Sequence, residues 1–227
     1  MISDFVLHVL LAIIPVIFAI TLHETAHGYA ALALGDTTAR DQGRLTLNPL
    51  KHIDRMGTII LPGILLITQL LTIHRVAFMF GWAKPVPVSA WRFANPRRGM
   101  AIVAIAGPVM NFFLAWLSAL GLRLLSDADV WASLFTVLSD FLLVNMVLGL
   151  FNLLPILPLD GGRVVAGILP ERLARSWAGL ERYGLLIVLV FILVLPNLFG
   201  INPVGDALGT ILPKALRLVF WLAGEHE

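Results

Sequence analysis

Long apolar stretches alternate with short polar connections along the chain. A helix needs about 20 apolar residues to cross a bilayer, and four stretches meet that length. They cover 3–34, 99–125, 133–157 and 183–200. Two less regular apolar stretches cover 56–74 and 204–223. The pattern predicts an all-α polytopic membrane protein with about five to six transmembrane segments.

Composition indicates the same lipid solvent. Of the 227 residues, 59% are hydrophobic and 13% are charged, and the mean hydropathy is +0.90. Soluble domains contain about 45–50% apolar and about 25% charged residues. The net charge is only +2, so the pI near 9.4 does not indicate a nucleic-acid partner. The chain has no cysteine, which leaves His, Asp and Glu as metal ligands.

The basic residues predict an orientation in the membrane. Lys and Arg gather in the connections 35–55, 75–98 and 158–182, whereas 126–132 and the N-terminal tail carry acidic charge only. The positive-inside rule places the three basic connections in the cytoplasm.

Two of these basic connections flank 56–74. If both lie in the cytoplasm, the stretch between them cannot cross the membrane only once. The stretch should enter and return from the same side, as a re-entrant or paired hairpin, with a break at Pro62-Gly63. Irregular backbone at that depth is tolerated when it is buried in protein or lines a cavity, so we expect this element beside a water-accessible site. A simple sixth crossing is the alternative.

The sequence HETAH places three ionisable side chains inside the first apolar stretch. His23 and His27 are four residues apart, so on a helix they share one face and can bind one ion. Two imidazoles and a carboxylate suit zinc, which keeps a fourth position for water. The zinc lowers the pKa of that water, and Glu24 beside it can take the proton, as in other HExxH metalloproteases. The alternative is a pair of interfacial histidines with a surface glutamate.

The best candidate for the third ligand is Asp160, in NLLPILPLDGGR (152–163). Two prolines end the preceding apolar stretch, and Gly161-Gly162 allow the backbone to approach a neighbour closely. Asp160 also lies at the predicted cytoplasmic end, which is the end that carries His23 and His27. A turn that only ends a helix is an equally good interpretation of these residues alone.

Several motifs together resemble a known family. They are HETAH (23–27), NLLPILPLDGG (152–162), GPVMN (107–111), FGWAKPVPV (80–88) and NPRR (95–98). This combination resembles the site-2 protease family of intramembrane zinc metalloproteases. Residues 80–98 look like its small bacterial and archaeal branch without PDZ or CBS domains. We expect no helix before the HETAH helix and no room for such regulatory domains.

The resemblance implies a role for each site residue. His23, His27 and Asp160 would bind one Zn2+, Glu24 would be the general base, and Asn152 would hold the substrate carbonyl or its oxyanion. The resemblance covers about residues 15–170, and we expect a single domain over 1–227. We expect that domain to combine three core helices (3–34, 99–125 and 133–157), a re-entrant or extended region (56–90) and accessory C-terminal helices (183–223).

Other polar residues have structural interpretations that compete with functional ones. Interhelical hydrogen bonding is the favoured interpretation for Asn111 and Asn145. His52 and Asp54 could form a second metal site, but a solvated surface is favoured in a basic loop. Trp82 fits an aromatic belt as readily as a substrate contact.

The leading functional hypothesis is an intramembrane zinc endopeptidase of a bacterial or archaeal cell membrane, which cuts a transmembrane substrate near the cytosol. GWAKPVPV (81–88) would pair with the unwound substrate by strand addition. One alternative is a non-proteolytic zinc-binding scaffold of the same architecture. The other is a metal transporter, which would show more spans and internal symmetry.

Overall fold

The computed structural model describes residues 2–75, 79, 81–125 and 132–225. Helices make up most of the described chain, and no β-strand occurs in it. The long helices are α1 (Ile2–Ala33), α4 (Pro96–Leu124), α5 (Ala132–Asn152) and α10 (Pro203–Leu222). The predicted all-α class is confirmed.

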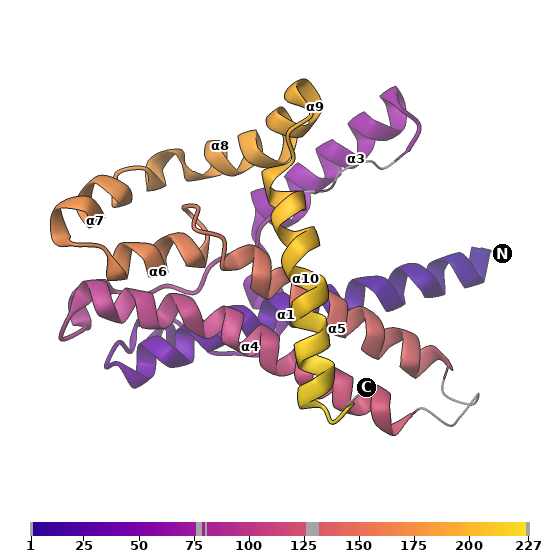
Figure 1. Cartoon of the computed structure of the whole chain (residues 1–227), viewed down its shortest axis with the longest axis horizontal. Coiled ribbons are helices and arrows are strands. Elements are labelled where there is room, and N and C mark those ends of the chain that lie inside the picture. Colours follow the sequence, from indigo (N-terminus) through magenta and orange to yellow (C-terminus); the bar gives the residue numbers. More distant parts are fainter. Residues whose placement is uncertain (1, 76–78, 80, 126–131, 226–227) are drawn as a thin grey trace.

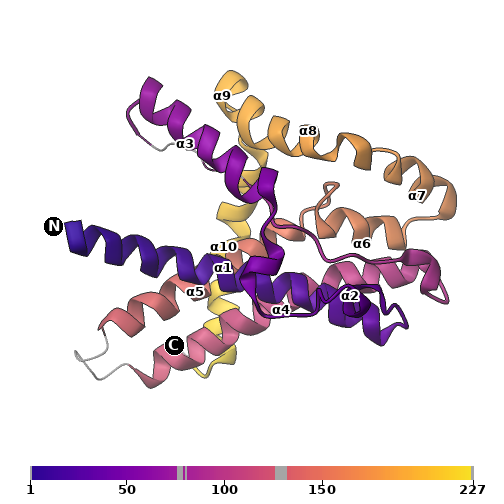
Figure 2. The ribbon, with the colours of Figure 1, turned by 180° about the vertical axis from the view of Figure 1, so that it is seen from behind.

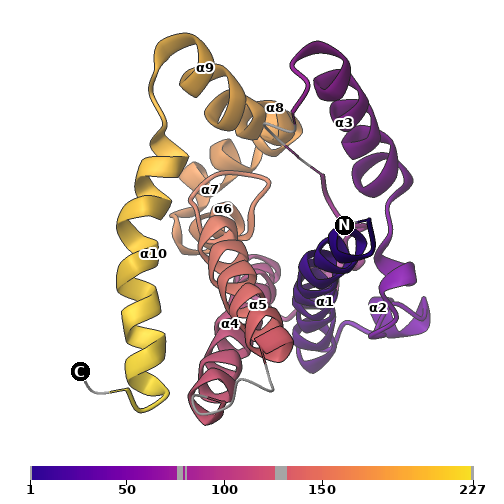
Figure 3. The ribbon, with the colours of Figure 1, turned by 90° about the vertical axis from the view of Figure 1, so that its right-hand side faces the viewer.

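Helices α1, α4 and α5 pack against one another and form the centre of the molecule (Figure 1). The end-on view shows these three side by side, with α10 on one flank and α3 (Leu61–Thr72) on the other (Figure 3). Small buried residues on α4, among them Ala104, Gly107 and Ala115, let its neighbours approach closely. These three helices overlap the stretches that the family resemblance suggested as a catalytic core, and their catalytic role stays a prediction.

Helix α5 ends at Asn152, five residues before the end of the predicted stretch 133–157. Pro155 and Pro158 lack the backbone N–H that a helix interior requires, so the apolar sequence continues as turns. These turns bring the chain back toward α1 and α4 and place Asp160 there.

Four helical stretches within the described chain are long and apolar enough to cross a membrane. They are Arg55–Thr72, Pro96–Leu124, Ser133–Asn152 and Glu171–Phe199. Helix α1 contains 32 residues, which also exceeds the required length of about 20. Helix α10 carries Asp206, Lys214 and Arg217 and is not among the four stretches.

The segment 55–82 leaves the bundle and returns to its starting point. A π-helical turn, η2 (Arg55–Ile60), continues directly into α3. The Trp82 N–H then donates to the Gly57 carbonyl (3.1 Å), and the Lys84 N–H donates to the His52 carbonyl (2.8 Å). Figure 2 shows the extended return crossing the bundle toward the start of α4. A return within 56–74 itself is not seen, because Arg55–Thr72 is one continuous helical stretch that is long and apolar enough to cross a membrane. We call η2, α3 and the extended return the hairpin.

The expected break at Pro62-Gly63 was wrong, because helix continues through both residues. In a π-turn the donor for a carbonyl lies five residues later, which for Gly57 is Pro62. Proline has no N–H to donate, so the Gly57 carbonyl is left for Trp82. The proline therefore provides the point at which the returning segment attaches.

A buried carboxylate, Asp36, joins the end of α1 to the connection before α4. It accepts hydrogen bonds from the Ser89 N–H (2.6 Å) and from both the N–H and the hydroxyl of Thr38. The Arg92 guanidinium lies 3.7 Å away. Burial alone would raise the pKa of Asp36, but these donors and the cation bring the pKa below its usual range.

The C-terminal third covers the open side of the core. Helix α6 (Asp160–Ile168) packs against α4, and α10 packs against α5 and α4. Between α6 and α10 the chain forms α7 (Glu171–Ala178), η5 (Glu181–Tyr183), α8 (Gly184–Leu189), η6 (Val190–Val194) and α9 (Leu195–Phe199). A Cβ at Gly184 would lie only 2.7 Å from Pro158 Cδ, so the start of α8 sits directly against the turn before Asp160.

Candidate metal centre

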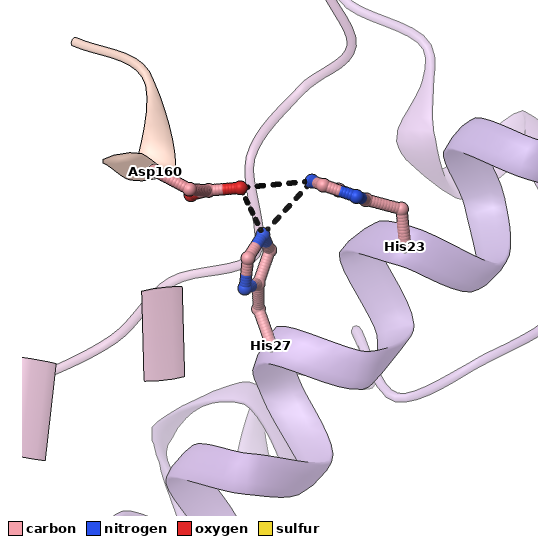
Figure 4. A group of neighbouring side chains, drawn as sticks. All are labelled: His23, His27 and Asp160. Carbon is pink, nitrogen blue, oxygen red and sulfur yellow. Dashed lines mark hydrogen bonds and ion pairs between the residues drawn. The ribbon is translucent and has the colours of Figure 1, made fainter. Parts of the chain in front are cut away.

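His23, His27 and Asp160 converge at one buried point between α1 and the start of α6 (Figure 4). The two imidazole Nε2 atoms are 3.0 Å apart, and they lie 3.2 and 3.3 Å from Asp160 Oδ2. The rings meet edge to face, with their centroids 4.6 Å apart. The i, i+4 spacing on α1 thus directs both histidines at the carboxylate, as the sequence predicted.

Contacts behind the two rings assign their protons. His23 Nδ1 lies 2.5 Å from Asn111 Oδ1, and His27 Nδ1 lies 2.7 Å from the Val103 carbonyl. Both partners accept, so each Nδ1 carries the hydrogen and each neutral ring presents an unprotonated Nε2. Two lone pairs and a carboxylate oxygen then face one another, an arrangement that a cation stabilises.

The donor set and spacing fit zinc. Zinc bonds of about 2.0–2.2 Å at tetrahedral angles separate neighbouring ligand atoms by roughly 3.3–3.5 Å. The observed separations of 3.0–3.3 Å are close to these values. Asp160 Oδ2 is also fully buried without a hydrogen-bond partner among the described residues. An orphaned carboxylate oxygen at this point is explained by a metal ion.

Two glycines allow Asp160 to reach the histidines. A Cβ at Gly161 would lie 2.2 Å from the Leu153 carbonyl oxygen, and one at Gly162 would lie 2.7 Å from the Ile156 carbonyl carbon. The start of α6 therefore folds tightly onto the preceding turns, and a side chain at either position would push it away. This confirms the close backbone approach expected from Gly161-Gly162.

The extended return of the hairpin holds Glu24 beside the metal ligands. The Val86 N–H donates to Glu24 Oε2 at 3.0 Å. The buried Arg44 fixes this extended segment, because its Nη2 donates to the carbonyls of Lys84 (2.9 Å) and Pro85 (3.3 Å). Among the described residues, none donates to Glu24 Oε1.

A cavity of about 390 Å³ opens in front of these groups. Helix α1 contributes His23 and Glu24 to its wall, and α5 contributes Asn152. Most of the remaining wall is apolar and comes from Ile20, Leu148, Phe151, Leu185 and Val188. The Asn152 amide donates to the Leu148 carbonyl on its own helix (3.0 Å), and its suggested catalytic role stays a prediction.

Sequence reasoning missed the role of Asn111. It does bond across helices as expected, since its amide donates to Asn145 Oδ1 (2.8 Å). Its oxygen, however, accepts from a metal ligand, His23. The position of Asn111 at the end of GPVMN on an apolar helix was the available signal.

The second candidate group, His52 and Asp54, was interpreted as solvated, and this was wrong for His52. Its side chain is buried, with 3% of the residue surface exposed, because the returning segment covers it. Asp54 Oδ1 accepts from the N–H groups of Met56 and Gly57 and caps η2. Within the described residues, the metal-ligand group comprises His23, His27 and Asp160.

Comparison with known proteins identifies the family. Residues 124–195 match the profile of Peptidase family M50. A Bacillus subtilis protein named "Putative zinc metalloprotease YwhC" is 38% identical over 214 residues, which cover 92% of this chain and 91% of the relative. The chain belongs to peptidase family M50.

Other relatives match over shorter ranges. A Mycobacterium tuberculosis protein named "Putative zinc metalloprotease Rip2" is 31% identical over 185 residues, or 80% of this chain and 66% of the relative. Zinc metalloprotease MJ0392 of Methanocaldococcus jannaschii is 33% identical over 78 residues, or 34% of this chain and 22% of the relative. No solved structure matches the chain significantly. Family membership and the ligand set together support Zn2+ as the cofactor. Family membership and the long apolar helices support a membrane protein.

Proposed function

We propose that the protein is an intramembrane zinc endopeptidase that hydrolyses a peptide bond of a transmembrane substrate. The observation that carries this proposal is the position of the metal group. Its two histidines lie on α1, and the groups that orient them, Asn111 and Val103, lie on the membrane-spanning α4. The cavity before them has mainly apolar walls, as a membrane segment would require.

His23, His27 and Asp160 would hold the zinc, which when bound would supply a Lewis acid that polarises a carbonyl and lowers the pKa of water. Glu24 Oε1 accepts a proton as the water oxygen bonds to the substrate carbonyl carbon. The Val86 N–H holds Oε2, so the carboxylate keeps one orientation. When the C–N bond breaks, the same oxygen returns the proton to the leaving amine.

Asn152 is suited to the charge that develops on the substrate carbonyl oxygen. An amide nitrogen carries two hydrogens, and the Leu148 carbonyl accepts one of them. The second remains for an oxyanion, and in other enzymes such a donor contributes about 2.7–4 kcal/mol to the lowering of the barrier.

The substrate must unwind before it is cut, because the carbonyls of a helix are already hydrogen-bonded. The segment Gly81–Val88 can receive the unwound chain. Its inner edge bonds to His52 and Gly57, whereas no described residue bonds to the backbone N–H or carbonyl of Ala83. Ala83 also lines the cavity, so the substrate can add there as a strand.

Cleavage is proposed near the cytosolic face of the cell membrane. His23 is the 22nd residue of α1, so about 32 Å of helix precede it at 1.5 Å per residue. The hydrocarbon core is about 30 Å thick. With the acidic N-terminal tail outside, His23 falls near the inner boundary of the core, where water can enter from the cytoplasm.

The test compares purified wild type with Glu24→Gln, and Glu171→Gln on the exposed face of α7 serves as the matched control. Zinc content is measured first, and then cleavage of a labelled transmembrane peptide. We expect zinc in all three proteins and cleavage by wild type and Glu171→Gln only. Equal cleavage by Glu24→Gln would overturn the mechanism. Zinc without cleavage in wild type would favour a non-proteolytic scaffold.

A further inference from the structure

A second cavity, of about 420 Å³, adjoins the catalytic one. It lies between α1, the loop that contains His52, and the base of the hairpin. Both cavities are lined by Ile20, Gly81, Trp82 and Ala83. The two spaces therefore share a wall, and a substrate strand paired at Ala83 passes both.

Trp82 lines both cavities, and its indole ring has a fixed position. A Cβ at Gly57 would lie 2.4 Å from three atoms of the Trp82 indole, so the ring rests directly on the Gly57 backbone. The Trp82 N–H bonds to the carbonyl of the same glycine. The second cavity is consequently a defined space beside the site and not a gap between loose side chains.

The cavity is apolar except for a few groups, and one of these is His52. Its Nε2 lies 3.0 Å from the Thr46 carbonyl, which accepts, so Nε2 carries the proton. Nδ1 is then an acceptor, and it is buried without a hydrogen-bond partner among the described residues. A buried acceptor without a donor costs free energy, so this atom indicates a ligand that brings one.

We infer that this second cavity is a specificity subsite, in which the protease binds a large apolar side chain of the unwound substrate near the scissile bond. His52 Nδ1 accepts a hydrogen bond from an N–H or O–H donor at the same substrate residue. The inference rests on the proposed function. The substrate is the expected occupant because Ala83, where it would pair, lines this cavity as well as the catalytic one. A strand that adds at Ala83 projects alternate side chains to opposite sides, and one side faces this cavity.

Unwinding of the substrate helix creates a need for hydrogen-bond acceptors near the scissile bond. A membrane segment that loses its helix exposes backbone donors, and lipid offers them no partner. An acceptor in a dry cavity satisfies one such donor, either the backbone N–H or a side-chain hydroxyl. Both sources share the same chemistry, and substrate variants separate them.

The experiment uses the zinc-loaded full chain in phosphatidylethanolamine–phosphatidylglycerol vesicles. The probe is a transmembrane peptide whose cut bond is located by mass spectrometry. Each of the four residues on either side of that bond is replaced in turn by Ala, Leu, Val or Thr. In wild type we expect one position at which Leu is preferred over Ala by about tenfold or more in kcat/KM.

Filling the cavity should abolish that preference. Ile17 lines it, whereas the neighbouring Phe18 does not and is similarly exposed. Ile17→Trp should lower the Leu/Ala ratio toward one, and Phe18→Trp should leave it unchanged. Zinc content shows that each variant is folded, and Leu50→Trp on another wall replaces Ile17→Trp if zinc is lost. Equal ratios in the filled and control variants would overturn the subsite.

His52→Gln tests the hydrogen bond, because a glutamine amide can still donate to the Thr46 carbonyl but lacks the Nδ1 acceptor. A side-chain donor predicts that wild type prefers Thr over Val by about two- to tenfold at the subsite and that the variant does not. A backbone donor predicts that an ester at that residue slows wild type and leaves the variant unaffected. If neither the Thr/Val preference nor the amide/ester preference differs between wild type and His52→Gln, the role of His52 is refuted. Failure of wild type to cut any peptide would instead refute the proposed function.

Discussion

Two side chains on α4 and α5 extend the metal group beyond its three ligands. The Asn145 amide donates to the Phe141 carbonyl, Asn111 donates to Asn145, and His23 Nδ1 donates to Asn111. The Asn111 amide also donates to the Ala19 carbonyl (3.5 Å), so the amide is fixed with its oxygen toward His23 and the ring has one orientation and one tautomer. Such contacts behind a ligand raise its basicity and are worth about 10–100-fold in metal affinity.

Asn111→Leu should therefore weaken zinc binding by about 10–100-fold while the chain still folds. Competition with a chelator measures the affinity. Ser118→Ala is the control on the same helix, since the Ser118 hydroxyl bonds only to the Leu114 carbonyl one turn back among the described contacts. Unchanged zinc affinity in Asn111→Leu would show that the asparagine only joins helices.

Gly107 provides the space in which the imidazoles lie. A Cβ there would be 2.5 Å from His23 Cε1 and 2.6 Å from His27 Nε2. Gly107→Ala should displace both rings and reduce zinc to well below one ion per chain, as measured by elemental analysis. Gly209→Ala, where a Cβ meets nothing within 4 Å, should retain zinc. Full zinc occupancy in Gly107→Ala would contradict the observed packing.

The residues that could be predicted from sequence were those whose geometry is local. Two histidines four apart on a helix share a face whatever the fold, so His23 and His27 followed from spacing alone. The contact of Asn111 depends on the rotation of α4 relative to α1, which one sequence does not reveal. His52 was misjudged because the returning segment buries it, and that segment lies about 30 residues later in the chain.

At the scale of elements, the return of the hairpin joins the proposed substrate-binding segment to Glu24, the proposed base. The extended segment that carries Val86 is held by Arg44, and its Val86 N–H donates to Glu24. The return after α3 thus lines the cavity before the metal group and contacts Glu24, although it carries no metal ligand.

Val86→Pro should lower kcat and leave zinc bound, because proline removes the N–H that holds Glu24 Oε2. A hydrogen bond to a charged group is worth about 1.5–3 kcal/mol, so the loss should be about 10- to 100-fold. Val88→Pro is the control, since no described residue accepts from the Val88 N–H. Equal kcat in both variants would show that the strand does not position Glu24.

Asp36 makes the stability of the junction between α1 and the connection before α4 depend on pH. Its folded pKa lies below the unfolded value of about 3.9, so its stabilisation is complete above that pH and is lost as the pH falls through the folded pKa. At neutral pH, Asp36→Asn should destabilise the protein by about 1.5–3 kcal/mol. Below about pH 4 the difference from wild type should shrink.

Thermal unfolding of the detergent-solubilised protein at a series of pH values measures this difference. Asp206→Asn, at an exposed position in the first turn of α10, is the matched control and should have a small effect throughout. A difference between wild type and Asp36→Asn that grows on acidification would contradict the assigned charge state.

Across the whole molecule, hydropathy predicted the long apolar helices, because lipid requires long apolar segments, but it did not predict α6 and α7 within the basic connection 158–182. It did not predict how the return of 81–88 closes on η2, since that contact depends on a proline at one position and a carbonyl five residues earlier. The end of α5 was predicted too late in the chain because hydropathy does not register prolines. Apolar composition continues to residue 157, but the prolines stop the helix at Asn152.

The orientation of the chain can be tested by labelling, because it contains no cysteine. Lys51→Cys lies in an exposed basic connection, and Leu124→Cys lies at the far end of α4. A membrane-impermeant maleimide should reach position 51 only from the cytoplasmic face and position 124 only from the opposite face. Labelling from the reverse sides would contradict the positive-inside assignment.

The most direct measurement concerns the bond that is cut. Wild-type protein with bound zinc is reconstituted in vesicles with a transmembrane peptide, and mass spectrometry identifies the products. We expect a single cut within the apolar stretch, near the end that lies on the side of the basic connections, and no cut with Glu24→Gln. Cleavage confined to the water-exposed flanks of the peptide, or a cut that persists without Glu24, would contradict an intramembrane zinc protease.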